Sequence, residues 1–419
     1  MQFNEFGLDA RLLVAVQELN YNAPTPIQAE AIPAALLGRD VIAAAMTGSG
    51  KTAAFLLPIL HRILQAPKLG TRLLVLTPTR ELCVQIHEAC TALGAHAGIS
   101  CAPIYGGVGM GPQEAAIQRG VTVLVATPGR LLDHLSRPYG HLDRIDFLVI
   151  DEADRMLDMG FLPDVRRVLA RLPNKRQTMF FSATLPPEVR TLSKEILTDA
   201  VAINVERKAM PATGVSQAVF AVHGGAKNAL FVALLSRKEI GSVIVFTRTK
   251  ARCNRLADYL DGQGIPNVRI HGNRTQGQRS TAMAEFKAGK VRVLCATDVV
   301  ARGIDIEALQ HVVNYDVPHG PGDYIHRVGR TARAEAVGEA FTFVSPEEEE
   351  ELRAIERAIG TKIERRALPE FELTYKPKRP PEPRKLEQRA LGQKKAARAG
   401  KKNSPEITTW GRSDGGGKR

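Results

Sequence analysis

Short apolar runs recur along the first half of the chain, with helical stretches between them. They lie at residues 41–45, 73–76, 121–126, 147–150 and 178–181. Runs that are continuously apolar, rather than alternating, are typical of parallel strands buried on both faces. A helical repeat of leucine and valine precedes them at residues 12–19 and is interrupted by Pro24, Thr25 and Pro26. We therefore expect residues 1–206 to form a doubly wound α/β domain.

The same rhythm resumes after residues 207–214, which have no periodicity and predict a linker. The later runs lie at residues 243–246, 268–271, 291–296, 311–315 and 340–344. They predict a second α/β domain over residues 215–365. From Lys376 onward Pro, Lys, Arg and Gly dominate and apolar residues become rare. Residues 366–419 are therefore expected to be a basic, disordered tail.

An acidic run at residues 347–351 is explained by the start of a helix, without a role in binding a metal or a partner. Ser345 is placed to cap a helix, Pro346 suits its first position, and acids are favourable in the first turn.

A glycine loop directly follows the first apolar run. Residues 47–52 read TGSGKT and open an apolar helical segment, which is the strand–loop–helix context of a phosphate-binding loop. Lys51 would reach the outer phosphates and Thr52 would ligate Mg²⁺. Ala45 stands where the strict pattern has glycine. Because the second domain lacks such a loop, we expect the nucleotide to lie between the two sheets, in an inter-domain cleft.

Two carboxylates, Asp151 and Glu152, end the apolar run at residues 147–150. Acids at the carboxyl end of a buried parallel strand face the crevice where ligands bind. With a phosphate loop upstream, Asp151 is expected to hold Mg²⁺ through water. Glu152 would orient or deprotonate the attacking water.

Composition fits a chain with two or three domains and a polyanionic partner. It has 419 residues, is 44% apolar and contains no apolar run long enough to span a membrane. The N-terminus lacks the pattern of a signal peptide, so a cytoplasmic location is expected. The five cysteines have no metal-like spacing and are expected to be reduced, structural thiols. Of the net charge of +13, residues 376–419 carry +10.

The run Asp151, Glu152, Ala153 and Asp154 resembles the motif that names the DEAD-box RNA helicases. Other motifs of that family occur on both sides of this run, in the family's order, across residues 1–335. The stretch His271, Gly272 and Asn273 is similar to the bacterial RhlE-like subgroup. The resemblance implies two tandem RecA-like domains that use ATP and Mg²⁺.

Under this resemblance the nucleotide residues come from both domains. Gln28 would read adenine and Tyr21 would pack on the base, with Phe3 at the spacing of an upstream aromatic and Asn20 where the family prefers glycine. Asp305 would touch the ribose, and Arg330 and Arg333 would act as arginine fingers. We expect the two arginines to share one helical face, and Ala332 between them replaces the commoner glycine. The ATP-binding residues of the loop are Thr47, Gly48, Ser49, Gly50, Lys51 and Thr52.

The resemblance also implies residues that bind RNA and residues that couple this binding to hydrolysis. Ser182 and Thr184 would form the coupling motif, with His326 linked to it. The segment 246–249 is similar to a further family motif of the second domain. The expected RNA-binding residues are Pro78, Arg80, Gly106, Gly107, Thr127, Gly129 and Arg130 in the first domain and Gln276, Arg279 and Thr297 in the second.

Two Thr-Pro pairs support this interpretation physically. Thr77 with Pro78 and Thr127 with Pro128 each follow an apolar strand, as an N-cap and a first-turn proline should. Helix N-termini and the turn at Gly106 and Gly107 would offer backbone N–H groups to phosphates, which holds a strand without reading its bases.

The expected function is an ATP-dependent RNA helicase that separates short duplexes by RNA-stimulated hydrolysis and domain closure. The chain would act as a monomer, with the ribosome or the RNA-decay machinery as possible partners. Two alternatives stay open: a DNA-directed enzyme on the same scaffold, and an RNA chaperone or annealing clamp that does not need hydrolysis. The tail would either tether RNA or serve only as a solubilising or linking segment.

Overall fold

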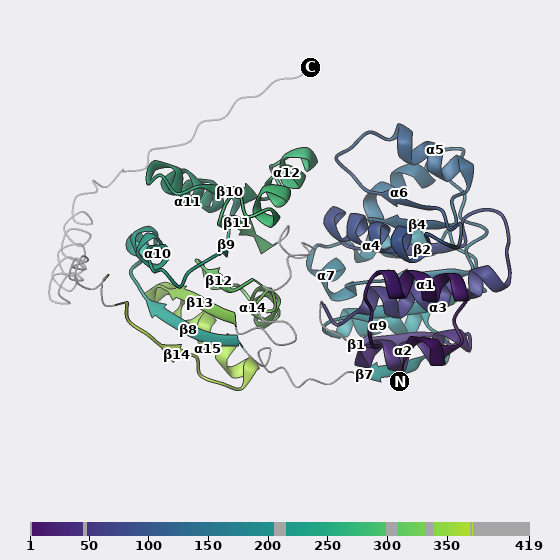
Figure 1. Cartoon of the computed structure of the whole chain (residues 1–419), viewed down its shortest axis with the longest axis horizontal. Coiled ribbons are helices and arrows are strands. Elements are labelled where there is room, and N and C mark those ends of the chain that lie inside the picture. Colours follow the sequence, from purple (N-terminus) through teal and green to yellow (C-terminus); the bar gives the residue numbers. More distant parts are fainter. Residues whose placement is uncertain are drawn as a thin grey trace, which may run out of the picture. The chain divides into compact units, whose positions relative to one another are not determined.

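The chain forms two parallel β-sheets with helices on their faces (Figure 1). The structure is a computed structural model that describes residues 2–44, 48–204, 215–298, 309–331, 338–368 and 371. Within these residues each sheet has seven strands, and all neighbouring strands are parallel. The two RecA-like domains expected from the sequence are therefore confirmed.

The first sheet has the strand order β3-β4-β2-β5-β6-β1-β7. Its strands are β1 (Val41–Ala44), β2 (Leu73–Leu76), β3 (Cys101–Ile104), β4 (Val123–Ala126), β5 (Phe147–Ile150), β6 (Gln177–Ser182) and β7 (Val201–Asn204). The helices are α1 (Ala10–Glu18), α2 (Pro26–Leu36), α3 (Lys51–Gln65), α4 (Arg80–Leu93), α5 (Gly111–Arg119), α6 (Pro128–Leu135), α7 (Ala153–Asp158), α8 (Leu162–Leu169) and α9 (Pro187–Ile196), after a 3₁₀ turn at Phe3–Phe6.

The second sheet has the order β10-β11-β9-β12-β13-β8-β14. Its strands are β8 (Val215–Ala221), β9 (Val243–Thr247), β10 (Asn267–Ile270), β11 (Val293–Thr297), β12 (His311–Asn314), β13 (Gly338–Val344) and β14 (Glu364–Arg365). The helices are α10 (Lys227–Leu235), α11 (Lys250–Gly262), α12 (Gln276–Lys287), α14 (Pro321–Val328) and α15 (Glu349–Ile359), with 3₁₀ turns at Gly224–Ala226 and Pro346–Glu348.

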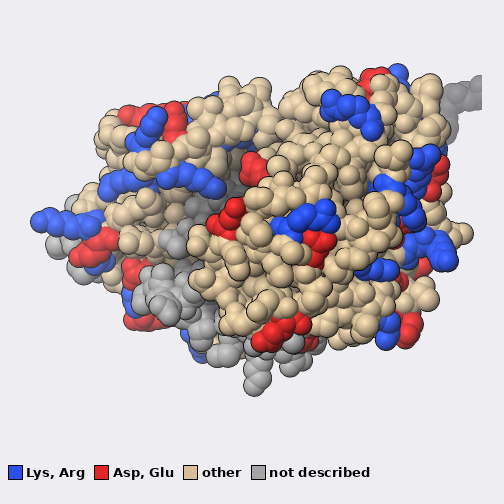
Figure 2. All heavy atoms as spheres, turned by 45° about the vertical axis from the view of Figure 1, so that its right-hand side comes forward, with Lys and Arg blue, Asp and Glu red and all other residues tan. Residues whose placement is uncertain are grey.

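Basic and acidic side chains nearly balance outside the tail. Residues 1–375 hold 43 basic against 40 acidic side chains. On the face drawn in Figure 2, Lys and Arg form separate groups among uncharged residues. No helix in the described residues has both the length and the apolar character to cross a membrane.

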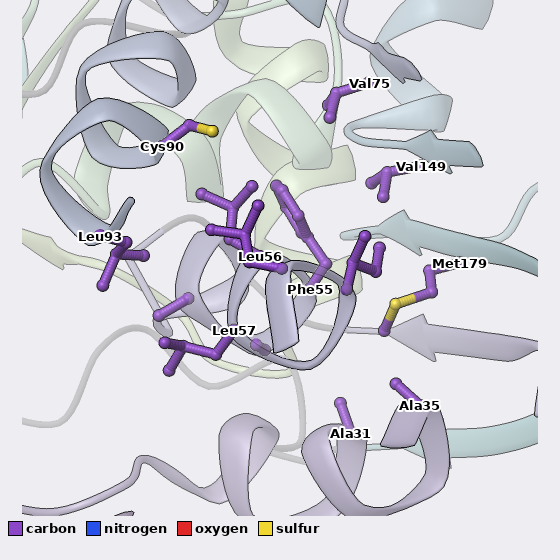
Figure 3. Packing of buried hydrophobic residues seen from close by; sticks show 14 of the residues in the cluster. Ala31, Ala35, Phe55, Leu56, Leu57, Val75, Cys90, Leu93, Val149 and Met179 are labelled. Carbon is purple, nitrogen blue, oxygen red and sulfur yellow. The ribbon is translucent and has the colours of Figure 1, made fainter. Parts of the chain in front are cut away.

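Two apolar layers enclose the first sheet. Helices α1 to α4 pack on one face and α5 to α9 on the other, and each layer is a separate buried cluster. Phe55 and Leu56 of α3 fill the space between strand residues such as Val149 and the alanines Ala31 and Ala35 of α2 (Figure 3). Burial on both faces explains why the strands are continuously apolar.

Each of the ten predicted apolar runs contains a strand, whereas β3, β7, β8 and β14 were not predicted. Three of these lie at sheet edges, where one side of a strand is unpaired and a continuous apolar run is not required. β3 includes Pro103, and β14 consists of Glu364 and Arg365 alone.

The acidic run at residues 347–351 begins a helix, as predicted. Ser345 and Glu348 form a capping box around Pro346, and α15 follows. Glu348 is also buried and paired with Lys227 at 2.6 Å, which the sequence did not indicate.

All five cysteines are free, and four of them are buried. Burial raises the pKa of Cys83 to about 12 and that of Cys253 to about 11. Thiols in this environment are poor nucleophiles.

Candidate functional site

The strand order of the first sheet sorts the predicted site residues into two groups. The phosphate loop follows β1, the acid pair follows β5, and Ser182 ends β6; these strands are neighbours on one side of the sheet. The segments expected to face RNA follow β2, β3 and β4, which are neighbours on the other side. Because all strands are parallel, both groups lie at the carboxyl edge of the sheet.

The phosphate loop has the backbone that its glycines permit. Gly48 (φ 79°) and Gly50 (φ 89°) are left-handed, and Gly50 precedes the first turn of α3. A Cβ at Gly50 would lie 2.5 Å from Nε2 of Gln28, so only glycine fits there. Lys51 and Thr52 open α3, as predicted. Thr47 lies outside the described residues.

Lys51 and Asp151 meet at the head of this loop. Lys51 Nζ lies 3.8 Å from Asp151 Oδ1, and both side chains are buried. Within the described residues this Nζ has no hydrogen-bond partner. Burial raises the pKa of Asp151 to about 6, with Lys51 opposing the shift and Glu152 adding to it. A buried ammonium without an acceptor, beside backbone N–H groups and a carboxylate, fits a phosphate group with a divalent cation.

Glu152 is held in place by Arg155. Glu152 has left-handed backbone (φ 53°) at the start of α7, and Arg155 Nη1 donates to Glu152 Oε2 at 2.7 Å. Burial alone would raise the pKa of Glu152, but Arg155 and Lys51 outweigh it and lower the pKa to about 2. The carboxylate is therefore ionised and can accept a proton from water. Arg155 was not predicted, although its i, i+3 spacing from Glu152 is visible in the sequence.

The coupling residues are bonded directly to the acid motif. Ser182 Oγ accepts from Asp154 N–H at 3.1 Å and donates to the Thr184 carbonyl at 2.7 Å. Thr184 donates from its N–H and its Oγ1 to Asp154 Oδ2, both at 2.8 Å. These bonds join the acid motif to the segment that follows β6. The sequence predicted Ser182 and Thr184, but not Asp154 as their partner.

Of the residues predicted to bind adenine, Gln28 lies beside the phosphate loop. The side-chain amide of Gln28 accepts from Thr25 N–H at 2.9 Å and donates to the Gly50 carbonyl at 3.1 Å, so it ties α2 to the loop. Phe3 lies with its ring centre 6.3 Å from that of Tyr21, which is 38% exposed. Asn20 has φ 57°, the conformation for which glycine is favoured. Base recognition by Gln28 and Tyr21 stays a prediction.

The RNA-side residues of the first domain converge around Gly107. This residue has φ 84°, and the Arg80 guanidinium packs so closely that an added Cβ would lie 2.0 Å from Nη1. Arg130 Nη1 donates to the Val108 carbonyl at 3.0 Å. Arg80, Gly106 and Arg130 thus come from three neighbouring strand ends and meet.

One of the two predicted N-caps is wrong. The cap of α4 is Thr79, whose Oγ1 accepts from Leu82 N–H at 3.3 Å, so Thr77 and Pro78 lie before the helix. β2 ends at Leu76, as the apolar run predicts, but Thr77 N–H still donates to the Ala126 carbonyl at 2.9 Å, so the helix begins only after Thr79.

The other predicted N-cap is in position. Thr127 precedes α6, Pro128 is its first residue, and Gly129 lies in its first turn.

The RNA-side residues of the second domain also lie at neighbouring strand ends. Gln276 and Arg279 lie in the first turn of α12, which follows β10, and Thr297 ends β11. Segment 246–249 ends β9 and leads into α11. Strands β10, β11 and β9 are adjacent.

Of the predicted arginine pair, only Arg330 is among the described residues, and it does not lie on a helix. Helix α14 ends at Val328, because Gly329 caps it, and Arg330 lies beyond the helix. His326 lies in the last turn of α14. Arg333 and Asp305 lie outside the described residues.

Arg327 was missed from the sequence, although it is buried in the second domain. Its guanidinium forms two bonds with Asp298, at 2.5 and 2.7 Å, and lies 5.3 Å from the ring centre of Phe246. It also donates to the side chain of Asn314 at 3.2 Å. Arg327 therefore joins β9, β12 and the end of β11 to α14.

The fold and this site define a P-loop nucleoside triphosphatase with two RecA-like domains. Residues 25–192 match the DEAD/DEAH box helicase family, and residues 226–335 match the helicase conserved C-terminal domain. The DEAD-box ATP-dependent RNA helicase CshA of Bacillus subtilis (strain 168) is 40% identical over 368 residues, which cover 88% of this chain and 74% of the relative. The chain belongs to the DEAD-box ATP-dependent RNA helicases, which are ATP hydrolases that act on RNA.

Solved structures of this family share the fold. S. cerevisiae Dbp5 bound to RNA and ADP BeF3 matches with a TM-score of 0.81 and 32% identity, over 89% of this chain and 97% of that one. Mss116p bound to ssRNA and AMP-PNP matches with a TM-score of 0.80 and 26% identity, over 96% and 86%.

Proposed function

We propose that this chain hydrolyses ATP in response to bound RNA and uses the cycle to separate short RNA duplexes locally. The observation that carries the proposal is the bonding of Asp154 to both Ser182 and Thr184. It joins the segment that holds the catalytic acid to the motif expected to sense RNA. The RNA-bound state of Dbp5 and of Mss116p in the structures above supports RNA as the partner.

The residues of the first domain account for ATP binding and water activation. Lys51 would bind the outer phosphates, because its buried ammonium needs an acceptor. Glu152, held by Arg155, would orient the attacking water and take its proton. Thr52 and Asp151 would hold Mg²⁺, which neutralises charge on the phosphate oxygens when bound.

The second domain would complete the site. Arg330 and Arg333 would stabilise the γ-phosphate in the transition state, Asp305 would bind the ribose, and His326 would contact the coupling motif. Arginine fingers contribute roughly 10³–10⁵ in rate in enzymes of this kind. If ATP and RNA each require both domains, each ligand favours closure and their affinities are coupled.

RNA would be held mainly through its backbone. Arg80, the turn at Gly106 and Gly107, and the first turn of α6 present guanidinium and N–H groups, which suit phosphates. Binding is therefore expected to tolerate any sequence.

The deciding experiment compares ATP hydrolysis without nucleic acid, with single-stranded RNA and with DNA of the same sequence, alongside unwinding of a short RNA duplex. We expect RNA alone to stimulate hydrolysis, and unwinding to require ATP. Equal stimulation by DNA would favour a DNA-directed enzyme. Strand annealing without ATP, in the absence of RNA-stimulated hydrolysis, would favour a chaperone or clamp.

Several finer assignments belong to the same proposal. His271, Gly272 and Asn273 support the RhlE-like subgroup, and a cytoplasmic location is part of the same proposal. We also propose that the chain acts as a monomer, with the ribosome or the RNA-decay machinery as its partner. Sedimentation of the purified protein and its recovery from ribosome gradients would test these two assignments.

The tail is proposed to tether RNA without sequence preference, because residues 376–419 carry 14 basic against 4 acidic side chains. Ending the chain at residue 375 should weaken RNA binding and flatten its dependence on salt, since fewer counterions are released. RNA affinity measured from 50 to 200 mM salt gives the slope. An unaltered slope would assign the tail a solubilising or linking role.

A further inference from the structure

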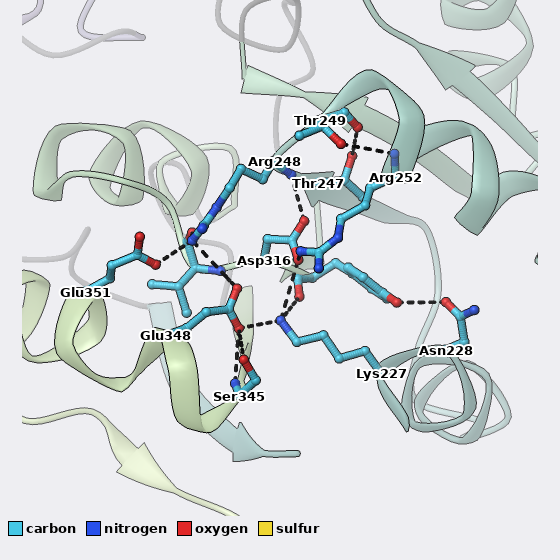
Figure 4. Close-up of polar contacts among 12 residues, drawn as sticks. Lys227, Asn228, Thr247, Arg248, Thr249, Arg252, Asp316, Ser345, Glu348 and Glu351 are labelled. Atoms are coloured by element: carbon cyan, nitrogen blue, oxygen red, sulfur yellow. Dashed lines mark hydrogen bonds and ion pairs between the residues drawn. The ribbon is translucent and has the colours of Figure 1, made fainter. Parts of the chain in front are cut away.

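Arg248 directly follows β9, which pairs with β11, the strand that ends in the predicted RNA-binding residue Thr297. Its side chain points into the second domain (Figure 4). Its Nη2 donates to the Val317 carbonyl at 2.8 Å and pairs with Glu351. The same nitrogen lies 3.7 Å from Glu348, and the side chain is only 25% exposed. The positive charge of Arg248 is therefore already neutralised inside the protein.

The backbone of Arg248 is fixed as well. Its N–H donates to Asp316 Oδ2 at 2.8 Å. The other oxygen of Asp316, which is fully buried, accepts from Arg252 Nη1 at 2.5 Å and lies 3.5 Å from Lys227 Nζ. One carboxylate thus connects the end of β9, the first turn of α11 and the start of α10.

Lys227 and Glu348 extend this set of contacts. Lys227 Nζ donates to Glu348 Oε2 at 2.6 Å and to the Tyr315 carbonyl at 2.8 Å, and both side chains are buried. Glu348 also accepts from Ser345 N–H at 3.1 Å and from Val317 N–H at 3.3 Å. Burial alone would raise the pKa of Glu348, but Lys227 outweighs it and the pKa is lowered.

We call this set the charge network: three cations and three carboxylates. Its members are Lys227, Arg248, Arg252, Asp316, Glu348 and Glu351. The formal charges balance, and its buried members have their hydrogen bonds largely satisfied. Buried networks of this kind fix one geometry, because removing one member leaves another charge without its partner.

We propose that the charge network is a positioning device for RNA binding, and that Arg248 acts through it rather than as a phosphate ligand. It fixes the segment 246–249 and the start of α11 near the predicted RNA-binding residues of this domain. These are Gln276 and Arg279 at the start of α12 and Thr297 at the end of β11. The inference rests on the proposed function, because it assigns a role in RNA binding. It goes beyond that function because it assigns the charge of Arg248 to holding the segment in place and not to contact with RNA.

The two roles of Arg248 predict opposite effects for Glu351→Gln. If Arg248 bound a phosphate directly, removing a neighbouring carboxylate would free the guanidinium, and RNA affinity would stay the same or rise. If Arg248 is a positioning residue, the same change loosens the segment and RNA affinity falls. We expect the RNA concentration for half-maximal ATP hydrolysis to rise several-fold, with the KM for ATP and the kcat at saturating RNA nearly unchanged.

The salt dependence of RNA affinity in Arg248→Met and Arg248→Lys also distinguishes the two roles of Arg248. A direct phosphate contact on single-stranded RNA contributes about 0.7 to the slope of log affinity against log salt. We expect Arg248→Met to weaken RNA binding about 10- to 100-fold, as for a displaced binding group, with the slope unchanged. Arg248→Lys should restore part of the affinity, because its ammonium still reaches one of the acceptors. A slope flattened by about 0.7 would overturn the inference.

The control is Arg365→Met, which removes ion pairs to Glu349 and Glu356 on α15 without touching the charge network. It should leave RNA binding unchanged. Hydrogen exchange of the full chain adds a readout that does not need RNA: amides of residues 246–250 should exchange faster in Arg248→Met and Glu351→Gln only. Unchanged exchange there would refute the inference while leaving the proposed function standing. A wild-type chain that does not bind RNA would refute the proposed function itself.

Discussion

At the scale of single residues, the acid motif depends on Arg155. A buried glutamate without a partner would be partly protonated near neutral pH, because burial disfavours the charged form. The ion pair at 2.7 Å keeps Glu152 ionised and fixes its position in left-handed backbone. The same ion pair makes Glu152 a weak base. Catalysis by Glu152 therefore depends on water being placed precisely and on charge stabilisation by other groups.

Replacement of Glu152 by glutamine should stop turnover without preventing binding. The amide has the size of the carboxylate but cannot accept a proton, so we expect kcat to fall by at least about 10²-fold. Nucleotide and RNA affinities should change little. Steady-state hydrolysis and equilibrium binding on the same preparation measure both.

Glu195→Gln is the matched control, since Glu195 pairs with Arg166 on the surface. It should hydrolyse ATP at the wild-type rate. Normal multiple turnover in Glu152→Gln would refute the role of Glu152.

The sequence located most of these residues, by different routes. Lys51 follows from the strand–loop–helix pattern and Asp151 from its place at the carboxyl end of a parallel strand, whereas Ser182 came from the family resemblance. The roles of Arg155 and Asp154 were not predicted, because the spacing of two residues shows that they are close along a helix but not which acceptor a side chain bonds. Arg330 was misplaced because Gly329 ends α14 earlier than the i, i+3 spacing suggested.

At the scale of elements, the turn after β3 depends on glycine at position 107. Its left-handed backbone and the packing of Arg80 against it leave no room for a side chain. The strand itself was not predicted, since β3 is a short edge strand with a proline. Its identity as a strand depends on pairing with β4, a long-range contact that local pattern does not report.

Gly107→Ala should therefore weaken RNA binding selectively. The alanine must either change φ or displace Arg80, and the backbone cost alone is about 1–2 kcal/mol. We expect the RNA concentration for half-maximal hydrolysis to rise several-fold, with the KM for ATP unchanged.

The comparison variant is Gly109→Ala, two residues along the same loop. An added Cβ there has no heavy atom within 4 Å. It should behave like the wild type. If both alanines have the same effect, the conformation of Gly107 is not what matters.

At the scale of the whole molecule, the sequence has one glycine loop of the phosphate-binding kind, at residues 47–52, and it belongs to the first domain. From this asymmetry we predict that the second domain completes the nucleotide site held by the first.

Arg330→Ala should abolish stimulation of hydrolysis by RNA while nucleotide binding to the full chain persists. The arginine is expected to act in the transition state only, and its loss should cost about 10³-fold or more in RNA-stimulated kcat. Arg330→Lys should recover little, because lysine lacks the planar guanidinium. Arg353→Ala, on the surface of α15, serves as the control. Unchanged stimulation in Arg330→Ala would remove the second domain from the reaction.

The order of strands in the first sheet has an evolutionary consequence. Loops that follow β2, β3 and β4 can diverge or be exchanged as a block, because no residue predicted to bind nucleotide lies among them. A descendant, or a designed chimera, could therefore acquire a different preference for polynucleotides while its energy-converting half stays intact. The border between the halves is the pairing of β2 with β5, where Leu73 to Leu76 lie in register with Phe147 to Ile150. Grafts that keep those two strands should tolerate the exchange.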